Sequence, residues 1–392
     1  MRVVHIITRL IVGGAQENTL LSCQGQHELG HEVTLITGPP LGPEGSLMDT
    51  ALAGGYRVEV LDVMRRALLP GKDFRTLSRL TARLRELRPD VVHTHSSKAG
   101  ILGRRAAFRA RVPVVIHTIH GLAFTASTRA LANGFYKFLE RRAAPWTHKI
   151  VCVADAMRDQ SLAAGIGTAD QYCTIYSGMK TEPFLESGSR RDEVRGRLGL
   201  LPNHIAVGTI ARLFHLKGHD DLLDIAPDLC RKWPDLRFLW VGDGLLNDDF
   251  QRRMREMGMR DRFILTGLVP PQVVPELTGA MDLLVHPSRR EGLARALVQG
   301  ELAGKPVIAY DIDGNREALI DGQSGFILPP FDKAQLAQRI DQLAGDPALR
   351  ADMGRRGREF AVARFDVKVM VRSLEELYAE LVSGQSGRRM GP

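Results

Sequence analysis

The sequence predicts an α/β fold made of two doubly wound parallel sheets. Strand-like apolar runs alternate with segments of helical periodicity from one end of the chain to the other, which is typical of parallel sheets covered by helices. The alternation restarts near residue 205, so two arrays of similar size follow each other. A chain of 392 residues is also longer than one ordinary core requires, which favours two domains.

The first array is expected to occupy residues 1–180. Its apolar runs predict strands at residues 3–7, 33–37, 90–93, 113–118, 149–153 and 172–176. The segments between them predict helices at residues 15–29, 77–87, 98–111, 126–143 and 155–164. Gly30 and Pro89 stand where two of these helices should end, because glycine adopts the left-handed cap conformation and proline cannot continue a helix.

The second array is expected to occupy residues 181–366. Its predicted strands lie at residues 205–210, 236–241, 263–265, 282–286, 306–310 and 325–328, with helices between them. Residues 181–201 are polar, charged and glycine-containing, which is typical of a hinge. Residues 367–392 are expected to form a helix, over residues 367–382, that crosses back to the first domain, followed by a short polar tail.

The composition is that of a globular protein with a basic balance. Hydrophobic residues make up 44% and charged residues 25%, near globular averages. The 53 lysines and arginines exceed the 45 acidic residues, and the net charge of +8 favours anionic partners such as nucleotide phosphates. No apolar run reaches the roughly 18 residues that span a bilayer. The four dispersed cysteines form no C-x-x-C pair. We therefore expect a cytoplasmic protein without disulfides or a structural zinc site.

One basic segment stands out between Lys98 and Arg111. Its cations are Lys98, Arg104, Arg105, Arg109 and Arg111, and no acidic residue lies between them. A solvated helix face is the simplest interpretation. The alternative is a surface that contacts anionic lipid or a phosphorylated acceptor, which would place the protein peripherally on the inner face of a membrane.

Two glycine-containing loops and one basic loop could bind an anion. Gly13 and Gly14 lie between the first strand and its helix, where backbone N–H groups can approach a phosphate. A tight turn of no chemical interest is an equal alternative. Gly242 and Gly244 follow a strand of the second domain, without the third glycine of a dinucleotide fingerprint. Arg212 and Lys217 flank the loop after residues 205–210, where two cations suit a diphosphate. Taken alone, ordinary surface charges would be the simpler interpretation of both.

A carboxylate and several histidines follow other strands. Glu291 stands directly before Gly292, Leu293 and Ala294, and a carboxylate beside backbone amides is suited to sugar hydroxyls, although an N-cap or a loop ion pair would explain it equally well. His120 lies outside its strand, beside Gly121, where it could face a ligand as a polar contact. His5 and His93 are expected to be core or edge residues.

Several familiar patterns do not fit the sequence. The histidines at residues 93–95 and 117–120 have no cysteine or carboxylate at ligand spacing, so a zinc cluster is not favoured. Residues 300–306 lack the glycine spacing and the Ser or Thr of a P-loop. Asp311 and Asp313 form a D-x-D that we interpret as a turn. Basic and aromatic residues do not interleave, so no nucleic-acid partner is expected.

Taken in order, these loops resemble family 4 of the retaining glycosyltransferases, which have the two-domain GT-B fold, in which two Rossmann-like domains face a central cleft. The resemblance runs over nearly the whole chain. Its strongest parts are GGAQENTL (13–20), HTHSSKAGILGR (93–104), VIHTIHG (115–121), the G-x-x-A-R…K-G run ending at Gly218, VGDG (241–244) and SRREGLARAL (288–297).

The resemblance implies roles for the residues already singled out. Arg212 and Lys217 would bind the donor diphosphate with help from the loop of Gly13 and Gly14, and His120 would lie near the transferred sugar. Glu291 would bind hydroxyls of that sugar, with the amides of residues 292–294 close to it or to the β-phosphate. The loop of Gly242 and Gly244 would belong to the same donor site.

One position departs from the family pattern. The family has a Glu-x7-Glu motif whose second Glu binds the nucleotide ribose, and here that position is Gln299. A neutral amide forms weaker hydrogen bonds than a carboxylate, so we expect a weaker donor site. Glu301 is two residues further and would point elsewhere on a helix.

The implied reaction is transfer from a nucleotide sugar, a UDP-sugar by family preference, to an acceptor hydroxyl with retention, and without a metal ion or other cofactor. Residues 93–104 and 115–121 further resemble enzymes that extend undecaprenyl-diphosphate-linked sugars, so a lipid-linked acceptor is a candidate partner. Two alternatives remain open: an epimerase or phosphorylase on the same fold, and a non-catalytic protein that binds sugar nucleotides.

Overall fold

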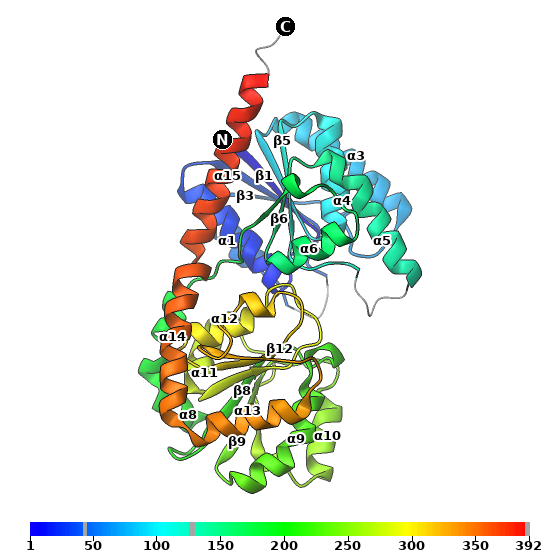
Figure 1. The fold of residues 1–392 in the computed structure, drawn as a ribbon. Helices are drawn as coiled ribbons and strands as arrows, with labels where there is room; N and C mark the ends of the chain where they lie inside the picture. Colours follow the sequence, from blue (N-terminus) through cyan, green and yellow to red (C-terminus); the bar gives the residue numbers. More distant parts are fainter. Residues whose placement is uncertain (42–44, 125–129, 389–392) are drawn as a thin grey trace. The chain divides into compact units, whose positions relative to one another are not determined.

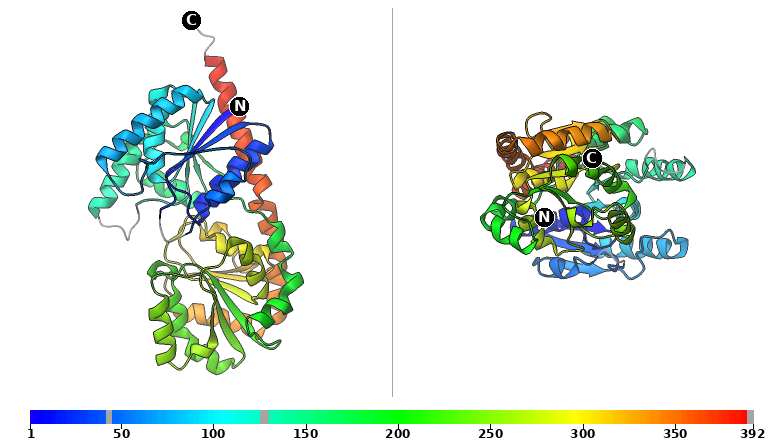
Figure 2. Two further views of the ribbon diagram at one scale, coloured as in Figure 1. Left: turned by 180° about the vertical axis from the view of Figure 1, so that it is seen from behind. Right: turned by 90° about the horizontal axis from the view of Figure 1, so that it is seen from below.

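The computed structural model describes residues 1–41, 45–124 and 130–388 of the chain. The chain divides into two compact units, of which unit 1 comprises residues 1–179 and 367–392 and unit 2 comprises residues 180–366. Each unit is a wholly parallel sheet covered by helices (Figures 1 and 2). The predicted α/β class with two Rossmann-like domains is therefore confirmed.

Unit 1 contains a seven-stranded sheet in the order β3-β2-β1-β4-β5-β6-β7. Its strands are β1 (Arg2–Ile7), β2 (Glu32–Thr37), β3 (Arg57–Val60), β4 (Val91–His95), β5 (Val114–Ile119), β6 (Lys149–Cys152) and β7 (Tyr172–Thr174). Its helices are α1 (Gly14–Glu28), α2 (Met48–Leu52), α3 (Pro70–Leu87), α4 (Ser97–Ala110), α5 (Ala130–Ala143), α6 (Asp155–Ala163) and α15 (Val367–Arg388).

Unit 2 contains a six-stranded sheet in the order β10-β9-β8-β11-β12-β13. Its strands are β8 (Ile205–Ile210), β9 (Leu236–Val241), β10 (Phe263–Leu265), β11 (Leu283–His286), β12 (Val307–Tyr310) and β13 (Gly325–Leu328). Its helices are α7 (Glu182–Leu185), α8 (Arg191–Arg197), α9 (His219–Lys232), α10 (Asn247–Glu256), α11 (Val274–Ala280), α12 (Arg295–Leu302), α13 (Lys333–Gly345) and α14 (Pro347–Phe365).

The strand order fixes where a ligand can bind in each unit. In unit 1 the order reverses between β1 and β4, and in unit 2 it reverses between β8 and β11. At such a switch point the connections leave in opposite directions, so the carboxyl ends of the two strands open onto a crevice. The loops after β1, β4, β8 and β11 are therefore the ones that position a site.

Alternating strand residues build the core of unit 1 on both faces of its sheet. Val4 packs with Leu77 and Leu80 of α3, whereas its neighbour Val3 packs with Leu374 and Tyr378 of α15. This alternation follows from the two-residue period of a strand. Helix α15 comes after unit 2 in sequence and is part of the core of unit 1 (Figure 1).

The predicted hinge over residues 181–201 is wrong. These residues form α7 and α8, and Phe184 and Val194 are buried in unit 2. The charged side chains that made the segment look like a linker are used internally, because Arg195 donates hydrogen bonds to the carbonyl oxygen of Ala280 at 3.0 Å and to Asp282 at 3.2 Å. The chain passes between the units at residues 179–180 and 366–367 instead.

Other differences are smaller. Strand β3 was not predicted, because it lies at the sheet edge and its sequence RVEV is only half-buried. The helix predicted at residues 126–143 is seen from Ala130, and its first residues lie outside the described part of the chain. Within the described ranges, no helix is both long and apolar enough to cross a bilayer.

Candidate active site

The loops after β8 and β11 meet at the switch point of unit 2. Gly218 has φ +72°, and a Cβ atom there would lie 1.9 Å from the carbonyl oxygen of Pro287, so only glycine allows this approach. The hydroxyl of Ser288 and the amide of Arg289 both donate to the carbonyl oxygen of Leu216, at 3.0 Å and 2.8 Å. These contacts hold the two loops together.

Lys217 and Glu291 form an ion pair where these loops meet. The Lys217 Nζ lies 2.5 Å from Glu291 Oε1, and the Nε2 of His286 lies 2.8 Å from the same oxygen. Burial by itself would raise the pKa of Glu291, but the charge of Lys217 and the hydrogen bond from His286 outweigh it, so the pKa lies below its ordinary value. Glu291 is therefore ionised over the whole neutral range.

The backbone around Glu291 is fixed by the loop after β12. The amide of Glu291 donates to Asp313 Oδ2 at 2.8 Å, and the amide of Gly314 donates to the carbonyl oxygen of Gly292 at 3.0 Å. Asp311, the other carboxylate of the D-x-D, forms an ion pair with Arg316. The interpretation of Asp311 and Asp313 as parts of a turn is thus confirmed.

Residues 292–294 lead directly into α12. Ala294 is the N-cap residue of this helix, and Leu293 and Ala294 are buried. A helix start presents backbone N–H groups and the positive end of the helix dipole, which favours an anion or a hydroxyl oxygen. The predicted donor residues Gly292, Leu293 and Ala294 therefore stand next to the Lys217–Glu291 pair.

The remaining residues of unit 2 that the sequence predicted to bind the donor are less closely joined to this pair. The guanidinium group of Arg212 lies 4.9 Å from the centre of the Phe214 ring, and among the described residues no hydrogen bond or ion pair joins it to Lys217 or Glu291. Gly242 and Gly244 allow close backbone contact, since a Cβ atom would lie 2.2 Å from the Ala211 carbonyl oxygen and 2.5 Å from that of Leu213, respectively.

Gln299 and Glu301 lie on α12 with different surroundings. Gln299 is half-buried. Glu301 is fully buried and accepts a hydrogen bond from Ser324, and burial raises the pKa of its carboxyl well above the ordinary value. Glu301 therefore points away from the direction of Gln299, as predicted, and lies in the core, so it does not replace the missing carboxylate at position 299.

In unit 1 the predicted residues lie at the carboxyl edge of the sheet. Gly13 and Gly14 follow β1 and begin α1, and His120 follows β5, two strands away. Thr8 and Ser96 lie between them at the switch point, with their hydroxyl oxygens 2.8 Å apart. Ser96 has φ +62°, a conformation that an L-residue rarely adopts and that is often found at functional sites. Neither Thr8 nor Ser96 was singled out from the sequence.

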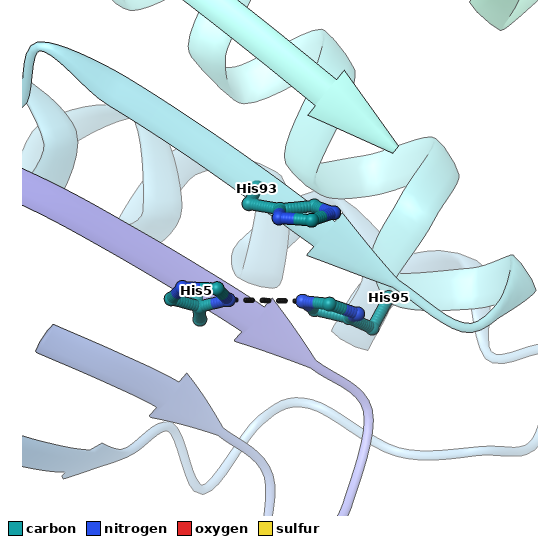
Figure 3. Close-up of side chains that lie close together, drawn as sticks. All are labelled: His5, His93 and His95. Carbon is teal, nitrogen blue, oxygen red and sulfur yellow. Dashed lines mark hydrogen bonds between the residues drawn. The ribbon is translucent and has the colours of Figure 1, made fainter. Parts of the chain in front are cut away.

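A chain of buried histidines leads to His120. His5 Nδ1 lies 2.9 Å from His95 Nε2 (Figure 3). His95 Nδ1 lies 3.1 Å from His120 Nε2, and at the other end of the chain the Gln26 side-chain oxygen lies 2.8 Å from His5 Nε2. Burial lowers the pKa of His5 to about 4 and that of His95 well below the ordinary value. Both rings are therefore neutral at pH 7. The prediction that His5 and His93 are core residues is confirmed.

Each neutral ring offers one donor and one acceptor, so the chain can run in only one direction at a time. Because the carbonyl oxygen of Gln26 faces His5, His5 Nε2 donates to it and His5 Nδ1 accepts from His95 Nε2. His95 Nδ1 then accepts from His120 Nε2. The arrangement holds His120 in the tautomer that carries its proton on Nε2.

The nitrogen atoms of His5, His93 and His95 are close enough together to be considered as metal ligands (Figure 3). All six ring nitrogens already have hydrogen-bond partners, however. Those of His93 lie 2.5 Å from the Tyr378 hydroxyl and 2.6 Å from that of Thr118. A metal ion would have to break these bonds, so the arrangement fits a hydrogen-bonded network better than a metal centre.

The basic surface predicted over residues 98–111 is smaller than the sequence implied. Lys98 pairs with Asp73 at 2.5 Å, and Arg104 is fully buried and pairs with Glu140 at 2.6 Å. Arg105, Arg109 and Arg111 are exposed. The prediction that all five cations form one surface is therefore wrong, because two of them face acidic partners from other elements.

Two family models match this chain, one in each unit. The Glycosyl transferase 4-like domain matches residues 13–178, and the model described as Glycosyl transferases group 1 matches residues 190–360. The chain belongs to the family 4 glycosyltransferases. The parts of this glycosyltransferase that match the two models contain every site residue that the sequence predicted, whereas His5 and Thr8 precede the first of them.

Relatives and solved structures agree with this assignment. The glycosyltransferase is 27% identical over 385 residues, 97% of each chain, to the UDP-Gal:alpha-D-GlcNAc-diphosphoundecaprenol alpha-1,3-galactosyltransferase of Escherichia coli. It is 25% identical to the alpha-D-kanosaminyltransferase of Streptomyces kanamyceticus, over 74% of this chain and 77% of that one. Anabaena HepE in complex with UDP-glucose has the same GT-B fold, with a TM-score of 0.82, 22% identity and coverage of 97% of this chain and 100% of that chain.

Proposed function

We propose that the protein transfers a sugar from a UDP-sugar to a hydroxyl group of a lipid-linked saccharide, with retention at the anomeric carbon. The observation that carries this proposal is the Lys217–Glu291 pair at the switch point of unit 2, beside the start of α12. It combines a cation for a phosphate with a carboxylate for sugar hydroxyls, which is what a nucleotide sugar requires.

The reaction needs few protein groups. The bond between the anomeric carbon and the β-phosphate oxygen breaks, the acceptor oxygen bonds to that carbon on the same face, and the acceptor proton passes to the leaving diphosphate. Lys217 and Arg212 stabilise the charge on the diphosphate, while Glu291 and His120 orient the sugar. Because these cations neutralise the leaving group, we propose that no divalent metal ion is required.

The donor and the stereochemistry are proposed from relatives. The Escherichia coli relative is named for UDP-Gal as donor and an alpha-1,3 linkage as product. A UDP-sugar of this kind is itself alpha-linked, so an alpha product corresponds to retention. The same name gives a diphosphoundecaprenol-linked acceptor, which supports the lipid-linked saccharide proposed here.

A membrane surface is proposed as a partner of unit 1, which would place the protein on the inner face of the membrane. Leu131, Phe135 and Phe138 are 91%, 45% and 56% exposed on α5, at helical spacing that puts them on one face. Arg105 and Arg109 are exposed on the neighbouring helix α4. Exposed apolar side chains beside arginines are typical of helices that lie on anionic membranes.

The donor proposal is tested by thermal unfolding with UDP, GDP, ADP and their sugar conjugates, each with and without EDTA. A ligand at 100 times its dissociation constant should stabilise the protein by about 2.7 kcal/mol. We expect stabilisation by the UDP series alone, unchanged by EDTA. Stabilisation by another nucleotide, or its loss in EDTA, would contradict the proposal.

The membrane proposal is tested by sedimentation with vesicles. We expect binding to vesicles of phosphatidylglycerol and phosphatidylcholine but not to phosphatidylcholine alone, and loss of binding for F135S/F138S. The control is F331S, which removes an exposed aromatic side chain from unit 2 (54% exposed). Equal binding by F135S/F138S and the native protein would refute the role of α5.

A further inference from the structure

Unit 1 contains a cavity of about 310 Å³ above the ends of its first three strands. Arg9 contributes from the loop after β1, Leu41 from the segment after β2, Arg65 and Arg66 from the segment after β3, and Lys72 from the first turn of α3. Its volume is at the lower end of the range for small-molecule sites. Thr8, whose hydroxyl lies against that of Ser96 at the switch point, also lines this cavity, and no role has been assigned so far to the cations around it.

The cavity carries positive charge that is not balanced locally. Four of its lining residues are cations, and none of the described lining residues is acidic. Among the residues that the structure describes, Arg65, Arg66 and Lys72 have no ion-pair partner. Two nearby cations that do not line the cavity are paired: Lys98 with Asp73, and Arg83 with Glu59 and Glu86. Three unpaired cations around one cavity create a site for a multiply charged anion.

One wall of the cavity is apolar and continues onto the surface. Leu41 and Leu69 line it and are 57% and 38% exposed, and Leu68 and Phe74 beside them are 57% and 69% exposed. Grouped exposed apolar side chains are typical of a surface that a ligand or partner covers. A free sugar phosphate would leave them in water, whereas an anion with an apolar tail would cover them.

We propose that this cavity binds the diphosphate group of an amphiphilic acceptor, with Arg65, Arg66 and Lys72 on the phosphate oxygens and Leu41 and Leu69 against the first part of the apolar tail. Arginine side chains bind phosphate oxygens in a bidentate way, and the start of α3 adds its dipole at Lys72. The inference rests on the lipid-linked acceptor proposed above and assigns the residues that recognise it.

The test is calorimetric titration of the whole protein with farnesyl diphosphate and with inorganic diphosphate, in saturating UDP so that the donor site is filled. The R65Q/R66Q variant removes two cavity cations. The matched control is R75Q/R79Q, which removes two exposed arginines of α3 that do not line the cavity. UDP is titrated separately into all three proteins.

We expect farnesyl diphosphate to bind at least tenfold more tightly than inorganic diphosphate. R65Q/R66Q should weaken it by about tenfold or more, because each substitution removes charge-assisted hydrogen bonds to the phosphate oxygens. The control should change it by less than twofold. If the affinity for farnesyl diphosphate falls equally in both variants, or in neither, the proposed site is wrong. If farnesyl diphosphate and inorganic diphosphate bind with equal affinity, the ligand is not amphiphilic. Failure of UDP to bind would refute the donor proposal alone, because farnesyl diphosphate binding is measured separately.

Discussion

The ammonium group of Lys217 lies 2.5 Å from a carboxylate oxygen of Glu291, although 74 positions separate the two residues in the sequence. Their side chains are 22% and 14% exposed, so the pair is largely shielded from water. Because charges interact more strongly where water is excluded, each residue fixes the orientation of the other. The pair therefore links the proposed diphosphate contact to the proposed sugar contact.

Replacing Lys217 should impair catalysis, because it removes a proposed contact to the diphosphate. We expect Lys217→Ala to lower turnover by roughly two orders of magnitude, the usual effect of removing one electrostatic contact from an active site. Arg212→Ala should lower it similarly if both cations bind the diphosphate. The measurement is kcat with the UDP-sugar that stabilises the protein. Lys232→Ala is the control, since Lys232 is exposed and pairs with Asp341. Near-normal turnover in the first two variants would refute their proposed roles.

The amide at position 299 should limit donor affinity. A carboxylate accepts hydrogen bonds about twice as strong as those of a neutral group, so Gln299→Glu should bind UDP several-fold more tightly. Glu301→Gln is the comparison, because Glu301 is turned into the core and should affect stability rather than UDP binding. Titration calorimetry with UDP gives both values. An unchanged dissociation constant in Gln299→Glu would show that this position does not contact the ribose.

The fold was predictable because each buried strand is a short apolar run. Strands β8, β9, β10 and β13 have the predicted bounds, and the side chains of β8, β9 and β13 are mostly buried. Strand β3 was not predicted, because it contains charged residues that pair at the surface, such as Glu59 with Arg83. Local sequence predicts a strand where burial makes its residues apolar. It does not predict a strand whose charged residues depend on partners far away in the sequence.

The same limit applies to the site. The sequence indicated Lys217, Glu291 and the glycines as site residues, because they follow strands. It did not indicate that Lys217 and Glu291 are in contact, because that contact depends on β8 lying beside β11. His286 carried no signal beyond its place at a strand end. The basic segment was overestimated because Glu140, the partner of Arg104, lies 36 positions away on another helix.

The Arg104–Glu140 pair should be important for the stability of unit 1. Glu140→Gln leaves the charge of Arg104 buried without its partner, and breaking a buried pair in this way typically costs about 3–5 kcal/mol. Glu86→Gln is the control, because Glu86 is 64% exposed and its pair with Arg83 should contribute less than about 1 kcal/mol. Urea unfolding measures both. Similar losses in the two variants would show that the buried pair has no special role.

Buried neutral histidines should make the protein sensitive to acid. Burial lowers the pKa of His5 to about 4 and that of His219 to about 3, whereas both are near 6.5 when unfolded. Between these values the unfolded chain binds protons that the native protein does not. The free energy of unfolding should therefore decrease as the pH falls from about 6.5 towards 4, by up to about 1.4 kcal/mol per pH unit for each such histidine.

His219 gives a direct test of this pH dependence. Neither of its ring nitrogens has a hydrogen-bond partner among the described residues, and the centre of its ring lies 4.7 Å from that of Trp240. The charges of Lys217, Asp220 and His286 also act on the pKa of His219. His219→Phe should keep the packing and reduce the loss of stability between pH 7 and pH 5. Unfolding curves at both pH values measure it, and an unchanged difference would exclude His219 as a source.

The histidine chain should control the protonated nitrogen of His120. His95→Asn keeps an acceptor near the Nδ1 position that contacts His120, whereas His95→Gln keeps only a group near the Nε2 position that contacts His5. We expect ¹⁵N spectra of labelled histidine to show the Nε2–H tautomer of His120 in the native protein and in His95→Asn, and a mixture in His95→Gln, with a lower kcat in the last alone. His93→Gln is the matched control. His93 is equally buried, and the centre of its ring lies 4.3 Å from that of His95, but its hydrogen bonds go to Tyr378 and Thr118. If His93→Gln and His95→Gln lower kcat equally and the tautomer of His120 does not change, the buried histidines have only a packing role. Stoichiometric zinc in the purified protein would exclude the hydrogen-bonded chain altogether.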